Sequence, residues 1–228
     1  MSQKTVVIYG AATMGQELVQ AVATAGCEVI LVDHSEEKLK KGLQKVEASL
    51  DAEIARWGLT SGEKRAIMSR IKGSTDIREA AKGWMVIETL KETLDVKRQL
   101  FKELDATCKP STIIASNSAT ISITEIASEC KYPERTIAMH FQSPIPKVPL
   151  VEISRGLKTS EETFEAAVRF AKMINKTVVS VYDCPGFITT RIILPMINQA
   201  VKVLEEGIAS CEQIDTAMKL GFGLNAGP

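Results

Sequence analysis

The stretch VVIYGAATMG, residues 6–15, decides the fold. Its first four residues are an apolar run of the kind that forms a buried strand. A helical pattern follows over residues 14–25, and Gly10 and Gly15 lie at the two ends of the connecting turn. A glycine-rich turn between a buried strand and a helix places the free N–H groups of the first helical turn where they can bind an anion. The stretch therefore predicts a βα unit with a phosphate-binding loop.

Apolar strands and amphipathic helices alternate along most of the chain. Residues 28–33 predict a second buried strand directly after the first helix. Further strands are expected at residues 84–89, 112–116, 136–141, 150–154 and 178–182. Repeated βαβ units with fully apolar strands predict a parallel sheet covered by helices on both faces. The expected fold class is α/β, a Rossmann-type doubly wound sheet.

The helices are predicted from the spacing of their apolar residues and from capping boxes. Apolar residues recur every three or four positions over residues 36–57, which indicates a long amphipathic helix. Thr60, Ser122 and Thr159 are each followed three residues later by Glu, the pattern of a capping box that opens a helix. We expect the helices between about residues 36 and 70 to form a helical hairpin inserted into the sheet domain.

Only helical patterns remain after residue 183. Residues 187–206 are apolar on most faces, and Pro195 is expected to bend this helix. A helix that is apolar nearly all round needs cover on several sides. We therefore expect two domains, residues 1–183 and residues 184–228. The second is expected to be the beginning of a truncated helical domain, its cover missing in a fragment or supplied by a partner subunit.

The composition argues against several classes of protein. The 228 residues contain 28 Lys plus Arg and 28 Asp plus Glu, so a net charge of zero gives no basis for nucleic-acid binding. Five cysteines, none at C-x-x-C spacing, argue against a metal site or a disulfide framework and indicate a reducing cytoplasm. The most apolar stretch, residues 188–204, contains Arg191 and Lys202, which argues against a membrane span.

The glycine turn and the second strand together predict a dinucleotide site. Gly10 allows the tight turn and Gly15 the close packing of helix and strand, whereas Ala12 replaces the glycine that usually lies beside the pyrophosphate. Asp33 ends the second strand, where a carboxylate accepts both ribose hydroxyls and repels a 2′-phosphate. NAD is therefore predicted in preference to NADP. The alternative is a turn of small residues without a ligand, and Asp33 argues against it.

The chain resembles the 3-hydroxyacyl-CoA dehydrogenase family along its whole length. The matching stretches include GAATMGQELVQAVATAG, VILVD, VIET, MHFQSP, PLVEI, DCPGFI and IDTAMKLGFG. The resemblance implies an NAD-binding Rossmann domain followed by a helical domain that forms a homodimer. It also implies oxidation of the L-3-hydroxyl group of an acyl-CoA to a ketone.

His140 and Glu152 are the candidate catalytic residues. The resemblance implies that His140, in the HFQSP stretch, is the general base and that Glu152, in the LVE stretch, orients it. Alcohol oxidation independently needs a base that works near pH 7, and histidine has a suitable pKa. A carboxylate on the other ring nitrogen fixes the tautomer and stabilises the imidazolium. The alternative is a buried histidine with a purely structural role.

The resemblance also implies which residues contact the cofactor. The glycine turn contributes five, the second strand contributes one, and three more lie near the nicotinamide. These residues are Gly10, Ala12, Thr13, Met14, Gly15, Asp33, Glu92, Lys97 and Asn117.

A further set is implied for the acyl-CoA substrate. It comprises Ser49, Arg56, Ser118, Ala119, Ser143 and Thr190. Arg56 keeps a positive charge for a CoA phosphate, although an ordinary solvated charge is the alternative. Three positions depart from the family pattern, because Ala119 replaces a serine while Ser143 and Thr190 replace asparagines. Each lost hydrogen bond costs about 1–3 kcal/mol if its partner stays buried.

Three functions follow from these observations. The one that we adopt is an NAD-dependent oxidoreductase that moves a hydride between the 3-hydroxyl carbon of a hydroxyacyl-CoA and NAD. The second is the same chemistry on a hydroxy acid that is not joined to CoA. The third is a non-catalytic nucleotide-binding homologue or accessory subunit, which the altered contact residues favour and the pairing of His140 with Glu152 opposes.

Overall fold

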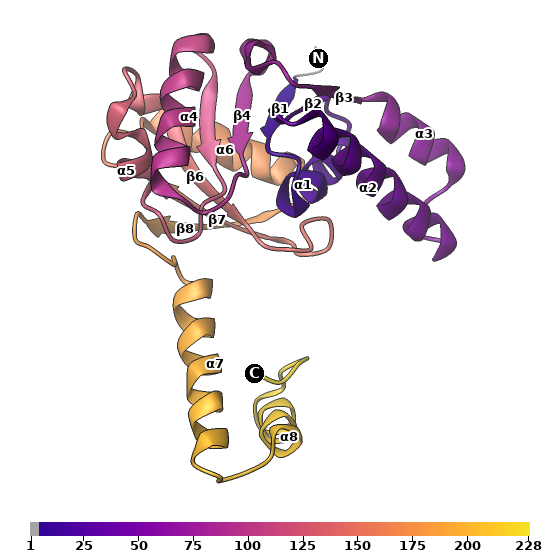
Figure 1. The fold of residues 1–228 in the computed structure, drawn as a ribbon, viewed down its shortest axis with the longest axis vertical. Helices are drawn as coiled ribbons and strands as arrows, with labels where there is room; N and C mark the ends of the chain where they lie inside the picture. The colour runs from indigo at the N-terminus through magenta and orange to yellow at the C-terminus, as the bar shows by residue number, and fades with distance from the viewer. Residues whose placement is uncertain (1–4) are drawn as a thin grey trace. The chain divides into compact units, whose positions relative to one another are not determined.

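The computed structural model describes residues 5–228, and its centre is one eight-stranded sheet (Figure 1). The strand order is β3-β2-β1-β4-β5-β6-β7-β8. The strands are β1 (Val6–Tyr9), β2 (Val29–Val32), β3 (Ile71–Ser74), β4 (Met85–Glu88), β5 (Ile113–Ser116), β6 (Thr136–Phe141), β7 (Leu150–Arg155) and β8 (Thr177–Tyr182). The order of the strands reverses between the neighbouring strands β1 and β4, and this is the switch point where α/β sheets bind ligands.

The pairing of β6 with β7 is antiparallel, whereas every other neighbouring pair in the sheet is parallel. The prediction of a wholly parallel sheet is therefore wrong at this point. Residues 142–149 connect the two strands, and a crossover between parallel strands takes a dozen or more residues. The chain consequently turns back on itself, and β7 runs against β6.

Strand β3 was not predicted from the sequence. Its residues read IKGS, and none of them is fully buried. As the edge strand beside β2, it needs apolar side chains less than the inner strands do. The apolar pattern that reveals the inner strands is consequently missing here.

Helices cover both faces of the sheet. They are α1 (Thr13–Thr24), α2 (Glu36–Ala55), α3 (Ser61–Ser69), α4 (Leu94–Thr107), α5 (Ile123–Ile126) and α6 (Glu161–Met173), with short 3-10 turns at Ile77–Lys82, Ala127–Glu129 and Pro133–Arg135. Helices α2 and α3 follow one another as a hairpin beside α1 (Figure 1). The capping box expected at Thr60 is present at the start of α3, whereas Ser122 caps α5 only through its own hydroxyl, which accepts from the Glu125 amide.

The start of α6 differs by one residue from the prediction. Ser160, not Thr159, caps the helix, and its hydroxyl accepts from the Thr163 amide. The Thr159 hydroxyl instead donates to the carbonyl of Thr136 and accepts from the Gly156 amide. Two adjacent hydroxyl residues offered the same local signal, and a tertiary contact decided between them.

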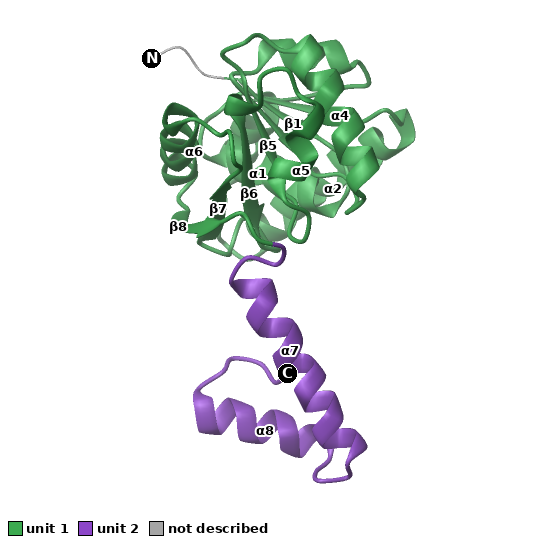
Figure 2. Ribbon diagram, turned by 90° about the vertical axis from the view of Figure 1, so that its left-hand side faces the viewer, with its two compact units in different colours: residues 1–184 green, residues 185–228 purple. Residues whose placement is uncertain are grey.

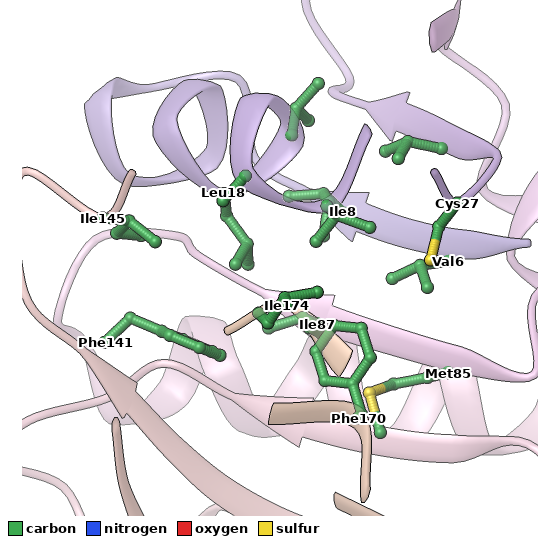
Figure 3. Close-up of a cluster of buried hydrophobic side chains, with 14 of the residues drawn as sticks. Val6, Ile8, Leu18, Cys27, Met85, Ile87, Phe141, Ile145, Phe170 and Ile174 are labelled. Atoms are coloured by element: carbon green, nitrogen blue, oxygen red, sulfur yellow. The ribbon is translucent and has the colours of Figure 1, made fainter. Parts of the chain in front are cut away.

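The main hydrophobic core joins α1 and α6 to one face of the sheet (Figure 3). Val6, Ile8 and Met85 point into it from the strands, and Leu18 and Phe170 enter it from the two helices. Since successive strand residues face opposite sides, Val7 and Val86 point away from this core. They are fully buried as well, on the face that α4 covers. Both faces are therefore dry, which explains the continuous apolar runs in the sequence.

The chain divides into two compact units, one ending at Cys184 and one spanning Pro185–Pro228 (Figure 2). The second contains α7 (Thr189–Glu205), which continues through Pro195, and α8 (Cys211–Phe222), which starts at a capping box and ends at Gly223. The predicted domain boundary between residues 183 and 184 lies beside this division and remains a proposal. No helix among residues 5–228 is long and apolar enough to cross a membrane.

Candidate active site

The turn after β1 requires glycine at both of its ends, Gly10 and Gly15. Gly10 has a φ of +115°, a conformation that side chains rarely adopt. A Cβ on Gly15 would lie 1.8 Å from the carbonyl oxygen of Gly10, so no side chain fits there. The Thr89 hydroxyl, which follows β4, lies 3.1 Å from the carbonyl oxygens of both Tyr9 and Gly10. These contacts hold the turn closely against two neighbouring strands.

The N-terminus of α1 is left open for an anion. Ala12 precedes the helix and supplies no side-chain cap, and the first turn contains no acidic residue. The first N–H groups of a helix lack partners within the helix, and the helix dipole makes this end positive. Thr13 and Ala12 are exposed, whereas Met14 is half-buried and Gly15 is buried. The predicted phosphate-binding loop therefore offers free N–H groups at an open helix end, and its binding of a pyrophosphate remains a proposal.

Asp33 is fixed at the end of β2. Its Oδ2 accepts from the Ala11 amide at 2.9 Å, and its Oδ1 accepts from the Ser35 amide at 3.0 Å. The residue is only 3% exposed. A carboxylate offers about four acceptor positions, so two positions remain for ribose hydroxyls. His34 lies beside it, with its side chain 71% exposed and its Nδ1 3.5 Å from the carboxylate.

A cavity of about 600 Å³ joins these parts. Its walls include the turn, Asp33, and three lysines of α2 at one side. The predicted cofactor residues that line it are Gly10, Ala12, Thr13 and Asp33, and the lysines are Lys38, Lys41 and Lys45. Glycines that admit no side chain, an open helix N-terminus and a strand-end carboxylate fit a dinucleotide in this cavity.

His140 and Glu152 face each other across β6 and β7. They are register partners in the antiparallel pair, and His140 Nδ1 lies 2.8 Å from Glu152 Oε2. His140 is 8% exposed and Glu152 is 1% exposed. The antiparallel turn that the sequence reasoning missed is what brings two residues twelve positions apart directly opposite one another. When Nδ1 carries the proton toward the carboxylate, Nε2 carries the lone pair that a general base uses.

Glu92 and Lys97 belong to a network of buried charges. Lys97, 1% exposed, lies 2.7 Å from Glu88 and 3.4 Å from Glu92. Burial raises the pKa of the Glu88 carboxyl, while the Lys97 ammonium acts in the opposite direction. Sequence reasoning missed Glu88, because it ends an apolar run that reads as a buried strand. Neither Glu92 nor Lys97 lines the cavity, so their predicted contacts with the cofactor remain proposals.

Asn117 and Ser118 follow the end of β5. The Asn117 Oδ1 accepts from the Phe141 amide at 2.8 Å, next to His140. The Ser118 hydroxyl donates to Glu92, and Glu92 also accepts from the amides of Ala119 and Thr120. The structure therefore brings most of this predicted contact segment to the sheet edge that carries the glycine turn.

Ser143 is tied to α1. Its hydroxyl donates to Glu17 at 2.8 Å, and the Ile145 amide donates to the other oxygen of the same carboxylate at 2.9 Å. Glu17 was not singled out in the sequence, where it reads as an ordinary polar position of the first helix. The signal that reveals it is tertiary, because the two elements lie far apart along the chain.

Ser49 and Arg56 do not line the cavity beside the glycine turn. Ser49 lies on the exposed face of α2, and Arg56 is exposed at the end of that helix. Thr190 lies in the first turn of α7, in the second unit. Their roles remain predictions. Within residues 5–228, no group of three or more His, Cys, Asp or Glu side chains could hold a metal ion.

Two family models and several known proteins match this chain over nearly its whole length. The family model of the 3-hydroxyacyl-CoA dehydrogenase NAD binding domain matches residues 5–184, and that of the C-terminal domain matches residues 186–228. A probable 3-hydroxybutyryl-CoA dehydrogenase of Bacillus subtilis is 40% identical over 228 residues, which is 100% of this chain and 79% of that protein. The human mitochondrial hydroxyacyl-coenzyme A dehydrogenase is 38% identical over 232 residues, covering 99% of this chain and 74% of the human one.

A solved structure gives the same result. The crystal structure of an (S)-3-hydroxybutyryl-CoA dehydrogenase from Ralstonia eutropha matches with a TM-score of 0.95 at 42% identity. The match covers 100% of this chain and 80% of that one. These similarities confirm the resemblance and the predicted fold class. The chain therefore belongs to the 3-hydroxyacyl-CoA dehydrogenase family and is an NAD-dependent oxidoreductase.

Proposed function

We propose that this oxidoreductase converts the 3-hydroxyl group of a 3-hydroxyacyl-CoA to a ketone. The observation that carries the proposal is the pair formed by His140 and Glu152 in a buried setting. His140 takes the proton of the 3-hydroxyl group at Nε2 while a hydride leaves the carbon that bears this hydroxyl. NAD, when bound, supplies the acceptor for that hydride. The products are the ketone, NADH and one proton, so electrons and atoms balance.

Glu152 prepares His140 for this step. Its carboxylate, 2.8 Å from Nδ1, fixes the ring in one tautomer and stabilises the imidazolium that forms. Burial of the pair strengthens this interaction, because the effective dielectric constant is lower there than in water. In the reverse direction the same imidazolium returns the proton to the ketone oxygen.

The substrate class rests on the relatives and on the matching positions. The relatives named above are 3-hydroxybutyryl-CoA and hydroxyacyl-coenzyme A dehydrogenases. Ser49 and Arg56 would bind the CoA part, and Ser118, Ala119, Ser143 and Thr190 would surround the reacting end. Two of these hydroxyls already have partners within the chain, since Ser118 donates to Glu92 and Ser143 donates to Glu17. The Asn117 side-chain NH₂ has no hydrogen-bond partner among residues 5–228, and we assign it to the ligand.

The cofactor proposal uses the open end of α1. The amides of Thr13, Met14 and Gly15 would bind the pyrophosphate, with Gly10 and Ala12 beside it. Asp33 would accept the ribose hydroxyls. Glu92, Lys97 and Asn117 would lie toward the nicotinamide. The Ala12 methyl group would displace the phosphate slightly, at some cost in affinity.

The test is the formation of NADH from a panel of 3-hydroxyacyl-CoAs and the matching free 3-hydroxy acids, with His140→Gln as the matched inactive variant. We expect turnover on the thioesters and its loss in the variant. Turnover on the free acids alone would show that the substrate is a hydroxy acid that is not joined to CoA. Binding of NAD without any turnover would favour a non-catalytic nucleotide-binding homologue or accessory subunit.

We also propose a homodimer formed through the helical unit, in a reducing cytoplasm. Neither α7 nor α8 contains a buried residue, and both expose large apolar side chains, among them Ile192, Leu194 and Phe222. Cys27, Cys108, Cys130 and Cys211 are free thiols. Sedimentation of the chain at increasing concentration tests the dimer, and a species that stays monomeric would contradict it.

A further inference from the structure

A buried ion pair lies where β4 meets α4. Glu88 Oε1 lies 2.7 Å from Lys97 Nζ, and the side chains are 0% and 1% exposed. Glu88 Oε2 also accepts from the Ser116 hydroxyl at 2.6 Å, at the end of β5. Removing two charges from water is costly, and apolar side chains of similar size often serve stability as well or better. Stability alone therefore gives no reason for charges at this place.

Lys97 extends the network to the segment of residues 117–120. Its ammonium lies 3.4 Å from Glu92 and donates to the Leu90 carbonyl at 3.2 Å. Glu92 Oε1 in turn accepts from the amides of Ala119, at 3.1 Å, and Thr120, at 2.8 Å. The Glu92 carboxylate, which pairs with the buried Lys97, thus binds the backbone of the turn that follows β5.

A second branch leads from Glu88 toward His140. The Asn117 amide donates to the Glu88 carbonyl at 2.9 Å, and Ser116 is bonded to the Glu88 carboxylate. The Asn117 side chain then accepts from the Phe141 amide at 2.8 Å. Phe141 is the residue after His140 in β6. The network therefore ends at the strand that carries the proposed base.

We propose that Glu88 and Lys97 are positioning residues of the dehydrogenase. They fix residues 117–120 and, through Asn117, the position of the His140 backbone relative to the bound ligand. The inference rests on the proposed function. Neither residue needs to touch the substrate, because a displacement of about 1 Å at a reacting group can lower the rate about 100-fold.

The chain offers a matched control on the same helix. Asp105, near the other end of α4, pairs with Arg135 at 2.7 Å, and both side chains are 5% exposed. Arg135 also binds the carbonyl of Lys109, in the loop that precedes β5. This pair resembles the first in distance and burial, and among residues 5–228 none of its hydrogen bonds or ion pairs reaches residues 117–120.

The experiment compares Glu88→Gln/Lys97→Met with Asp105→Asn/Arg135→Met in the full chain. Each double variant replaces a buried ion pair by neutral groups of similar size. Amide hydrogen exchange at Thr120 and Phe141 reports whether the hydrogen bonds of these two amides persist. The values of kcat and KM report how their loss affects catalysis. We expect exchange at both amides to rise about tenfold or more, and kcat to fall about 100-fold with KM changed far less, in the first variant only.

Two outcomes overturn the inference. One is unchanged exchange at Thr120 and Phe141 in the Glu88 and Lys97 variant, and the other is an equal rise in the control. If that double variant does not fold, the same measurements are made on Glu88→Gln alone, in which Lys97 keeps Glu92 as its ion-pair partner. A wild-type chain without turnover would refute the proposed function, and the exchange measurement would still judge the positioning.

Discussion

The Ser143 hydroxyl donates a hydrogen bond to Glu17 at 2.8 Å and so joins the segment after β6 to the helix that follows the glycine turn. The Ile145 amide donates to the same carboxylate at 2.9 Å. Ser143 occupies the position at which the family motif has asparagine. Its side chain is thus committed to the protein, and the carboxylate of Glu17 holds the segment between His140 and Glu152.

We expect Glu17→Ala to be more harmful than Ser143→Ala. The first change removes two hydrogen bonds and leaves the Ile145 amide without its partner, whereas the second removes one. The expected losses in the free energy of unfolding are about 2 kcal/mol and about 1 kcal/mol. Urea unfolding of both variants measures the difference. Equal losses would show that the Ile145 bond contributes nothing.

Glu152→Gln is expected to lower kcat by about 10³-fold or more while NAD affinity stays unchanged. The amide NH₂ of glutamine can donate to Nδ1 and so favours the wrong tautomer of His140. Stopped-flow kinetics and NADH fluorescence measure the two quantities separately. An equal loss of NAD affinity would show that the change has disturbed the sheet edge as a whole.

Gly15→Ala is expected to abolish NAD binding or prevent folding, because its Cβ would lie 1.8 Å from the Gly10 carbonyl oxygen. Gly62→Ala is the control, since the nearest atom there is 3.9 Å away. Ala12→Gly should bind NAD several-fold more tightly, because it removes the methyl group beside the pyrophosphate. Calorimetry measures all three variants. Weaker binding by Ala12→Gly would contradict the assigned position of the phosphate.

The acid stability of the turn at residues 117–120 follows from Glu92. Partial burial acts to raise the pKa of Glu92, but hydrogen bonds from Ser118 and Thr120 and the charge of Lys97 outweigh it, so the pKa lies below the ordinary value. A lowered pKa in the folded state contributes stability above the unfolded value of about 4.3, and this is lost as the pH falls through the folded value.

Thr120→Ala removes one of those hydrogen bonds, so it should raise the pKa of Glu92 and move the onset of acid unfolding to higher pH. Carbon NMR of the Glu92 carboxyl and acid titration of the unfolding signal measure the two effects. Thr107→Ala is a control on α4, because among residues 5–228 the Thr107 hydroxyl donates only to the Glu103 carbonyl. An unchanged Glu92 pKa in Thr120→Ala would refute the assignment.

The sequence predicted the parts of the site that depend on local pattern. Gly10, Gly15 and Asp33 follow from a strand, a turn and a second strand, because each is read within its own βα unit. The predicted parallel direction of β7 was wrong, although the connection before Leu150 is too short for a crossover between parallel strands. Glu88 could not be distinguished from its apolar neighbours, since a buried charge is visible only through a partner such as Lys97. Glu17 was equally hidden, because its contact with Ser143 joins segments far apart in the chain.

The lysines beside the cofactor cavity have a kinetic consequence. The chain has no net charge, yet Lys38, Lys41, Lys45 and Lys91 all line the same cavity as Asp33. Among residues 5–228, Lys41 is the one of these four that has an acidic partner, Glu37. A dinucleotide carries two negative phosphates, so these ammonium groups attract it before contact. Such attraction acts over roughly a Debye length, about 8 Å at physiological ionic strength. Local charge, rather than the total, would thus set how quickly NAD arrives and how strongly added salt slows it.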